Sequence, residues 1–244
     1  MGTGTIHTST EVIKMDLKDK KILLIGGGHS LDKAIITRLE QAGGEVVVAG
    51  ETGLAFDVFE IDSLEANLKG LLAQDGAFDG FVFSVVHSDF RPLGTVKPAN
   101  FNKIMTENTS VFVESIRVLN KSKGLKPGAS VVVMSSISSI RAMKAKMAFS
   151  ASKAALDAVV RELAIELADK GIRVNSIQKG AVDTDFEKNQ IQAIDAIRGE
   201  NILSAQPLGL CKSVEVANLV AFLLSDEVKT MTGAAIVLDG GYTL

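Results

Sequence analysis

Several residue types that define other classes of protein are scarce in this sequence of 244 residues. It has one cysteine, Cys211, which excludes an internal disulfide and a cysteine-based metal cluster. Its three histidines show no spacing typical of metal ligands, so we expect no metal site. There is no apolar run of about 18 residues and no signal-peptide pattern, which predicts a soluble, cytoplasmic protein that does not associate with membranes.

Charge of one sign is also lacking. The chain has 26 basic and 29 acidic residues spread along its length, which argues against a nucleic-acid partner. What is plentiful is hydrophobic content, at 46%, enough for one large core. We expect residues 1–19 to form a flexible tail and residues 20–244 to form a single domain.

Apolar runs rich in Val and Ile alternate with longer helix-periodic stretches along the chain. This alternation is typical of an α/β fold with one doubly wound (Rossmann) parallel sheet and helices on both faces. The expected strands are Lys21–Gly26, Glu45–Ala49, Gly80–Val86, Ser130–Met134, Ile172–Ile177 and Ala234–Leu238. The expected helices are Leu31–Ala42, Ile61–Leu72, Asn100–Leu119, Ala151–Ala168 and Val214–Leu224. The least regular stretch, 183–208, follows a strand and is expected to lie over a ligand crevice.

A glycine-rich turn joins the first expected strand to the first expected helix, from Gly26 to Asp32. Backbone N–H groups and the helix dipole would meet a pyrophosphate there. Asp32 argues against that use, because its carboxylate would repel a phosphate. Asp32 also suits the first turn of a helix by itself, where it could replace the phosphate.

Glu51 follows the second expected strand, where a carboxylate could accept hydrogen bonds from ribose hydroxyls and would repel a 2′-phosphate. NAD is therefore favoured over NADP if any cofactor is bound. The alternatives are a solvated loop carboxylate and no cofactor at all.

Phe149 and Lys153 have the i, i+4 spacing that puts two side chains on one helical face. With the glycine-rich turn and this pair, the chain resembles the short-chain dehydrogenase/reductase family. The resemblance covers residues 20–244 and is nearest to 3-oxoacyl-ACP reductase-like members. It implies a cofactor site at Gly26, Ser30, Leu31, Glu51, Asp57, Val58, Lys153 and Thr184. Ser30 and Asp32 stand where the family has its second and third glycines. Val86 replaces a further glycine, in the family's Asn-Asn-Ala-Gly motif.

The resemblance also assigns catalytic positions to Asn108, Ser136, Phe149 and Lys153. In the family a tyrosine at position 149 transfers the proton, lysine lowers its pKa and holds the ribose, serine binds the substrate oxygen, and asparagine holds a water. Phe149 has no hydroxyl to give or accept a proton. Ordinary dehydrogenase or reductase activity is therefore doubtful.

Other groups near this site have competing interpretations. His87 and Tyr242, the one tyrosine of the chain, are candidate substitute proton donors. An exposed loop histidine is the ordinary interpretation of the first, and a residue near subunit contacts that of the second. Lys144 and Lys146 are interpreted as solvated charges, and Lys179 replaces a proline of the family's loop around the nicotinamide.

Three functional hypotheses follow. The first is an NAD(P)-dependent oxidoreductase acting on a small-molecule carbonyl or hydroxyl group. The second is a non-catalytic relative that acts as a partner subunit or binds a ligand, and the third is non-redox chemistry through His87, Ser136 and Lys153. The family also implies a homo-oligomer, a dimer or tetramer built through the two long helices, although their apolar stripe would equally suit a monomer's core.

Overall fold

The computed structural model describes residues 15–26, 28–50, 56–185, 187–189 and 205–244. Its strands are β1 (Lys21–Gly26), β2 (Glu45–Gly50), β3 (Phe78–Phe83), β4 (Leu125–Ser136), β5 (Arg173–Lys179) and β6 (Ala235–Leu238). Its longer helices are α1 (Ser30–Gln41), α2 (Ile61–Asp75), α3 (Pro98–Met105), α4 (Val111–Lys121), α5 (Met147–Glu166) and α7 (Ser213–Leu224). Most of the tail expected at 1–19, and Glu51, lie outside the described residues.

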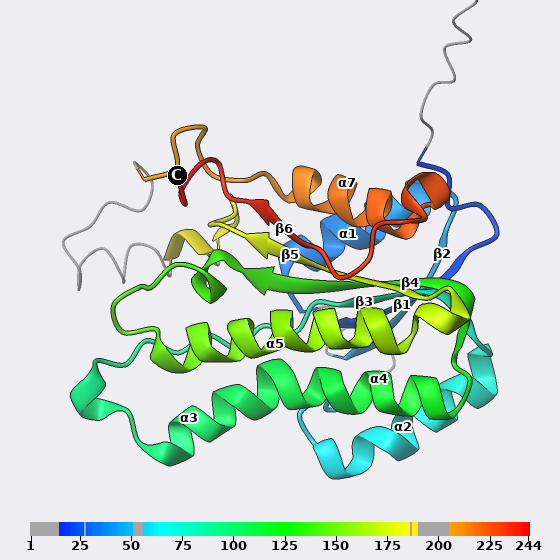
Figure 1. Ribbon diagram of the computed structural model, residues 1–244, viewed down its shortest axis with the longest axis horizontal. Helices are drawn as coiled ribbons and strands as arrows, with labels where there is room; N and C mark the ends of the chain where they lie inside the picture. Colours follow the sequence, from blue (N-terminus) through cyan, green and yellow to red (C-terminus); the bar gives the residue numbers. More distant parts are fainter. Residues whose placement is uncertain (1–14, 27, 51–55, 186, 190–204) are drawn as a thin grey trace, which may run out of the picture.

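The strands in the described part of the chain form one parallel sheet in the order β2-β1-β3-β4-β5-β6. The prediction of a doubly wound parallel sheet is confirmed. All the strand arrows in Figure 1 point to the same side, so the carboxyl ends of the strands share one edge. The chain reverses its direction of winding between β1 and β3, and a ligand crevice is expected where the winding reverses.

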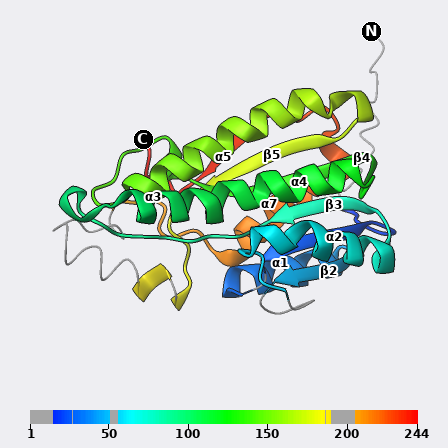
Figure 2. The same ribbon diagram turned by 90° about the horizontal axis from the view of Figure 1, so that it is seen from below.

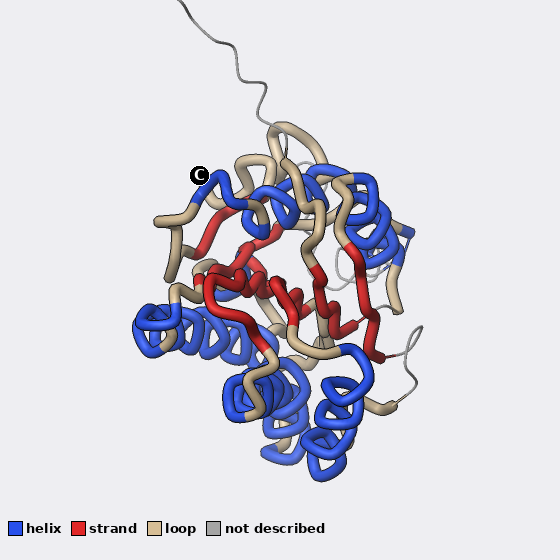
Figure 3. Tube along the Cα trace, turned by 90° about the vertical axis from the view of Figure 1, so that its right-hand side faces the viewer, coloured by secondary structure: helices blue, strands red, loops and turns tan. Residues whose placement is uncertain are grey.

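Helices cover both faces of the sheet, as the end-on view in Figure 3 shows. Helices α1 and α7 lie on one face, and α2, α4 and α5 lie on the other (Figures 1 and 2). Strand β1 shows why the sequence dictates this arrangement: Ile22 and Leu24 pack toward α1 and α7, while Leu23 and Ile25 pack toward the opposite helices. A strand buried on both faces needs an unbroken apolar run, which β1 has.

Several expected elements differ from the structure in their bounds: β4 is longer than the expected Ser130–Met134, and α5 begins before the expected Ala151. Two further differences bear on the site. The helix expected over Asn100–Leu119 is divided into α3 and α4 by a π-helical turn at Thr106–Ser110. Side-chain hydrogen bonds hold this turn: the Asn108 amide bonds to the backbone of His87, and the Thr109 hydroxyl donates to the Ser152 carbonyl at 2.9 Å. Strand β3 was expected to reach Val86 but ends at Phe83, so the following residues are released from the sheet to line the crevice.

None of the described helices is both long and apolar enough to cross a lipid bilayer.

Candidate active site

The turn after β1 holds a buried carboxylate. Asp32 is 2% exposed in the first turn of α1, and its Oδ2 accepts a hydrogen bond from the His29 backbone N–H at 3.2 Å. Its Oδ1 accepts a hydrogen bond from the Ser84 hydroxyl at the end of β3. The carboxylate thus occupies a backbone donor of the kind that helix N-termini offer to phosphates. The expectation that Asp32 could replace a phosphate agrees with these contacts.

Gly26 ends β1 with a φ of +146°, a backbone conformation that residues other than glycine rarely adopt. A Cβ there would also lie 3.2 Å from the Cβ of Ser84. Glycine at this position therefore allows the turn after β1 to lie close against the segment that follows β3.

A cavity of about 350 Å³ opens beside this turn, at the point where the sheet reverses its winding. Its walls come from three connections at the carboxyl edge of the sheet. They consist of Gly26, Gly28, His29 and Asp32 after β1, Val58 and Phe59 after β2, and Ser84, Val85, Val86, His87 and Ser88 after β3. The two predicted cofactor residues after β2 that the structure describes differ: Val58 lines the cavity, whereas Asp57 is exposed and accepts a hydrogen bond from the Phe59 N–H.

A second, much smaller cavity of about 30 Å³ adjoins the first, and the two share His29, Asp32, Ser84 and Val86. Among its other lining residues are three predicted cofactor contacts, Ser30, Leu31 and Thr184, together with Lys179 and Glu187. Lys179 forms an ion pair with Glu187. The other carboxylate oxygen of Glu187 accepts from the Val182 N–H at 2.6 Å, and the Glu187 N–H donates to Thr184 Oγ1 at 3.1 Å.

The four predicted catalytic residues come from three neighbouring elements. Ser136 ends β4, and its hydroxyl accepts a hydrogen bond from the Ser138 N–H at 3.1 Å. Phe149 and Lys153 lie one turn apart near the start of α5, with the lysine Nζ 5.9 Å from the centre of the phenylalanine ring. Asn108 lies in the π-helical turn. The side-chain amide of Asn108 is hydrogen-bonded to the His87 backbone and to the Ser152 hydroxyl.

Lys153 is fully enclosed. Its Nζ donates a hydrogen bond to the Met134 carbonyl at 3.1 Å and approaches the Val85 carbonyl at 3.5 Å. Burial lowers the pKa of Lys153 to about 7, with a further lowering from the charge of Lys179 and an opposing effect from Asp157. In this chain the Lys153 amine, which the family directs to the ribose, is hydrogen-bonded to a backbone carbonyl.

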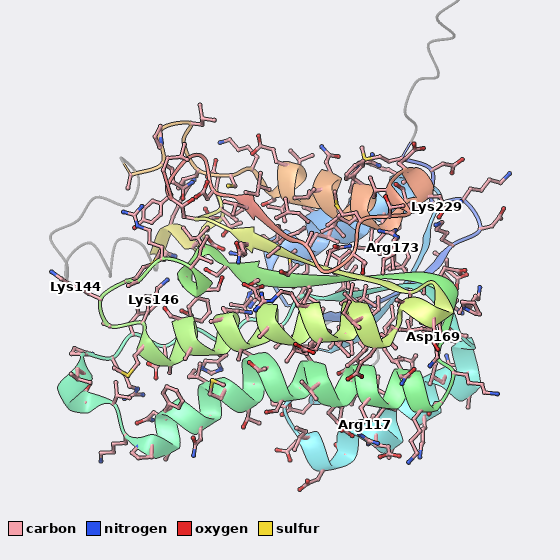
Figure 4. The ribbon with its side chains drawn as sticks, viewed as in Figure 1. Arg117, Lys144, Lys146, Asp169, Arg173 and Lys229 are labelled. Carbon is pink, nitrogen blue, oxygen red and sulfur yellow. The ribbon has the colours of Figure 1, made fainter. Side chains whose placement is uncertain are left out.

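Lys146 lies over the ring of Phe149. Its Nζ is 5.1 Å from the centre of that ring and 4.8 Å from the centre of the Phe90 ring. Lys146 is partly exposed, so its interpretation as a solvated charge stays a prediction, and the quadrupoles of two aromatic rings add to its stabilisation. Lys144 is exposed, and Figure 4 shows both lysines at the end of the molecule where the strands' carboxyl termini lie.

His87 is not an isolated loop side chain. Its Nδ1 lies 2.7 Å from Glu107 Oε2, and its ring meets the Phe59 ring edge to face at 6.5 Å. Glu107 is 8% exposed, and Lys103 Nζ lies 3.7 Å from its other oxygen. The interpretation of His87 as an exposed loop histidine agrees with the structure, since 38% of its side chain is exposed, but the buried carboxylate partner was not expected.

Tyr242 is buried against Ile137, the residue after Ser136, and the Arg141 guanidinium lies 4.2 Å from the centre of its ring. The one tyrosine of the chain thus lies on the Ser136 side of the crevice, and its use as a substitute proton donor stays a prediction. The described residues contain no cluster of three or more histidine, cysteine or acidic side chains that could hold a metal ion.

Comparison with known proteins decides the family. A family model described as "Enoyl-(Acyl carrier protein) reductase" matches residues 20–243. The chain belongs to the short-chain dehydrogenase/reductase family. It is 29% identical to L-xylulose reductase of Caenorhabditis elegans, over 93% of this chain and 97% of that protein. It is 25% identical to a 3-oxoacyl-[acyl-carrier-protein] reductase of Vibrio harveyi, over 93% of this chain and 98% of that protein.

A solved structure of a short-chain dehydrogenase family protein from Francisella tularensis superposes with a TM-score of 0.81 at 28% identity. The match covers 92% of this chain and 98% of that one. The resemblance to 3-oxoacyl-ACP reductase-like members is thereby confirmed, and this is a family of oxidoreductases that bind NAD(P). The roles that the family gives to Asn108, Ser136 and Lys153 stay predictions for this chain.

The sequence interpretation missed Glu107, Glu187 and the contact of Lys146 with two aromatic rings. Glu107 directly precedes Asn108, and only the π-helical turn buries both of these neighbours. Glu187 lies in the stretch 183–208, where the sequence predicted irregular structure but no particular contact. A lysine three residues before Phe149 at the start of a helix was the available signal for Lys146, because residues three apart on a helix lie on one face.

Proposed function

We propose that this short-chain dehydrogenase/reductase binds a ligand in the family's crevice and does not carry out the family's hydride transfer at an appreciable rate. The observation that carries the proposal is Phe149, 5% exposed at the tyrosine position. A phenyl ring cannot donate or accept a proton. General acid catalysis is worth roughly 100- to 10,000-fold in rate, about 3 to 5 kcal/mol of barrier.

The cofactor side of the crevice supports the same proposal. A phosphate charge about 5 Å from the Asp32 carboxylate would be repelled by roughly 3 kcal/mol at an effective dielectric constant near 20. Lys153 is enclosed by backbone carbonyls and has no exposed surface to offer a ribose. We expect weak binding of both dinucleotides, with NAD ahead of NADP because Glu51 would repel a 2′-phosphate.

A second candidate function is slow, NAD(P)-dependent reduction of a small-molecule carbonyl, or oxidation of a hydroxyl. Lys146 favours it, because its ammonium group lies over the ring of Phe149 and is a proton donor beside the missing hydroxyl. In this alternative Ser136 would bind the substrate oxygen. Lys146 would protonate the alkoxide that hydride transfer leaves.

The test measures oxidation of NADH and NADPH with a general carbonyl probe such as phenanthrenequinone. We expect wild type and Phe149→Tyr to stay near background, and the double variant Phe149→Tyr with Asp32→Gly to gain activity because both lesions are repaired. Wild-type turnover well above background would overturn the proposal. Loss of that turnover in Lys146→Met, but not in Lys144→Met or Tyr242→Phe, would establish the second candidate.

We further propose that the protein is a cytoplasmic homo-oligomer built through α4 and α5. Apolar side chains on the solvent side of these helices support it: Val113 is 41% exposed, Met147 47% and Ile165 78%. These are the large apolar side chains that α4 and α5 expose, and the family resemblance implies an assembly through the same two helices. Light scattering should give a mass of at least two chains, and Ile165→Lys should lower it, whereas a monomeric wild type would refute this assembly.

A further inference from the structure

The larger cavity and the smaller one beside it differ in the ligand they can accept. The cavity of about 350 Å³ lies at the lower end of the range of small-molecule sites, which suits a ligand of nucleoside size. The smaller cavity, at about 30 Å³, has room for about one or two water molecules. The Lys179–Glu187 ion pair and the Asp32–Ser84 hydrogen bond lie in its walls. A ligand confined to the larger cavity leaves the Lys179–Glu187 ion pair in place, because neither residue lines that cavity.

The boundary between the two cavities already carries a negative charge, the carboxylate of Asp32. Asp32 brings a buried carboxylate to the helix N-terminus and occupies the His29 N–H. Lys153 is directed to backbone carbonyls and lines neither cavity. A phosphate on the ligand would meet a carboxylate there, while a neutral or positively charged group would be tolerated or attracted.

The walls of the larger cavity suit a flat ring. Val58, Val85 and Val86 supply apolar surface, and the Phe59 and His87 rings meet edge to face on one side. Ser88 supplies a polar atom, since its hydroxyl oxygen is buried in the cavity wall without a hydrogen-bond partner among the described residues. Rotation of the Ser88 side chain toward the cavity would give this hydroxyl a partner when a ligand with ring nitrogens or hydroxyls enters.

We infer that the larger cavity binds a phosphate-free aromatic heterocycle of nucleoside size, neutral or cationic at the end that faces Asp32. This inference rests on the proposed function and names the chemical class of its ligand. It reverses the charge preference of a dinucleotide site, because the carboxylate of the protein stands in for the phosphate of the ligand.

The test is a calorimetric titration with compounds that share one base and ribose and differ in charge at the 5′ position. The probes are 5′-amino-5′-deoxyadenosine, adenosine, AMP, ADP and NAD. We expect affinity to fall in that order, with at least a tenfold difference between adenosine and AMP. The wild-type series decides the inference without any variant: AMP binding tighter than adenosine, or no binding of any probe at millimolar concentration, would overturn it.

Two variants test the role of Asp32. Asp32→Asn should flatten the series to within about threefold, while the matched change Asp62→Asn, an exposed carboxylate in the first turn of α2, should leave the order intact. An unchanged order in a folded Asp32→Asn protein would overturn the assignment to this carboxylate. Failure of the ligand class is distinct from failure of the proposed function, since only turnover with NADH or NADPH contradicts the latter.

Discussion

Replacing Lys153 by methionine should change the pH dependence of stability in a defined way. The amine is fully enclosed in α5, beneath the ring of Phe149, and burial lowers its pKa from 10.5 to about 7. In the unfolded chain the amine keeps its ordinary pKa. The folded state therefore holds one proton fewer than the unfolded state between about pH 7 and 10.5, and in that window stability rises with pH.

The magnitude follows from the shift. Each pKa unit is worth about 1.4 kcal/mol, so keeping the charged amine buried costs about 5 kcal/mol below pH 7, and this cost vanishes toward pH 10.5. Methionine avoids the cost but leaves the Met134 carbonyl without its donor, a loss of about 1 to 3 kcal/mol. We expect Lys153→Met to be more stable than wild type by about 2 to 4 kcal/mol at pH 6 and to lose that advantage near pH 10.

The assay is urea denaturation of both proteins at intervals between pH 6 and pH 10. The difference in unfolding free energy should change by about 1.4 kcal/mol per pH unit above pH 7. Lys144→Met, which removes an exposed lysine from the same end of the molecule, should give a flat difference. A flat difference for Lys153→Met as well would refute the argument, because it would mean that the amine titrates alike in the folded and unfolded states.

Two further predictions concern buried positions that support the site. Asp157→Ala should cost about 3 kcal/mol of unfolding free energy, because its carboxylate accepts hydrogen bonds of 2.8 Å from both Ser176 and Gln178. In urea denaturation the stability of Asp157→Asn should lie between that of Asp157→Ala and that of wild type. An Asp157→Ala protein as stable as wild type would contradict the network. Gly26→Ala should destabilise by about 1 to 3 kcal/mol because of its positive φ, whereas Gly70→Ala in α2 should stabilise by about 0.5 to 1 kcal/mol. Thermal melts showing the same sign for both glycine variants would count against this strain.

The fold was predictable because its signals are local. The apolar run of β1 and the alternation of strands with helix-periodic stretches predicted a doubly wound parallel sheet, and the structure confirms it. The divided helix at Thr106–Ser110 was not predictable, because the side chains of Asn108 and Thr109 bond to residues far away in the sequence. Tertiary contacts of this kind leave no periodic signature.

The candidate site was predictable in its residues but not in their partners. Ser136, Phe149 and Lys153 were assigned by resemblance to the family, and the structure places Phe149 and Lys153 one turn apart on α5 and Ser136 at the end of β4. That Lys153 bonds to a backbone carbonyl, or that Lys146 lies over Phe149, depends on rotamers set by packing. One sequence carries the first kind of information and not the second.

The π-helical turn has a consequence for how this chain can vary. It buries three consecutive side chains, Glu107, Asn108 and Thr109, which a regular helix of 3.6 residues per turn would spread over most of its circumference. A π-helical turn closes i→i+5 hydrogen bonds and so holds one residue more than a turn of α-helix, and deleting one residue here would join α3 and α4 into one regular helix. Such a deletion would move Asn108 and Thr109 away from their hydrogen-bond partners, His87 and Ser152. The one extra residue of this turn is thus what ties the α3–α4 helix both to the loop after β3 and to α5.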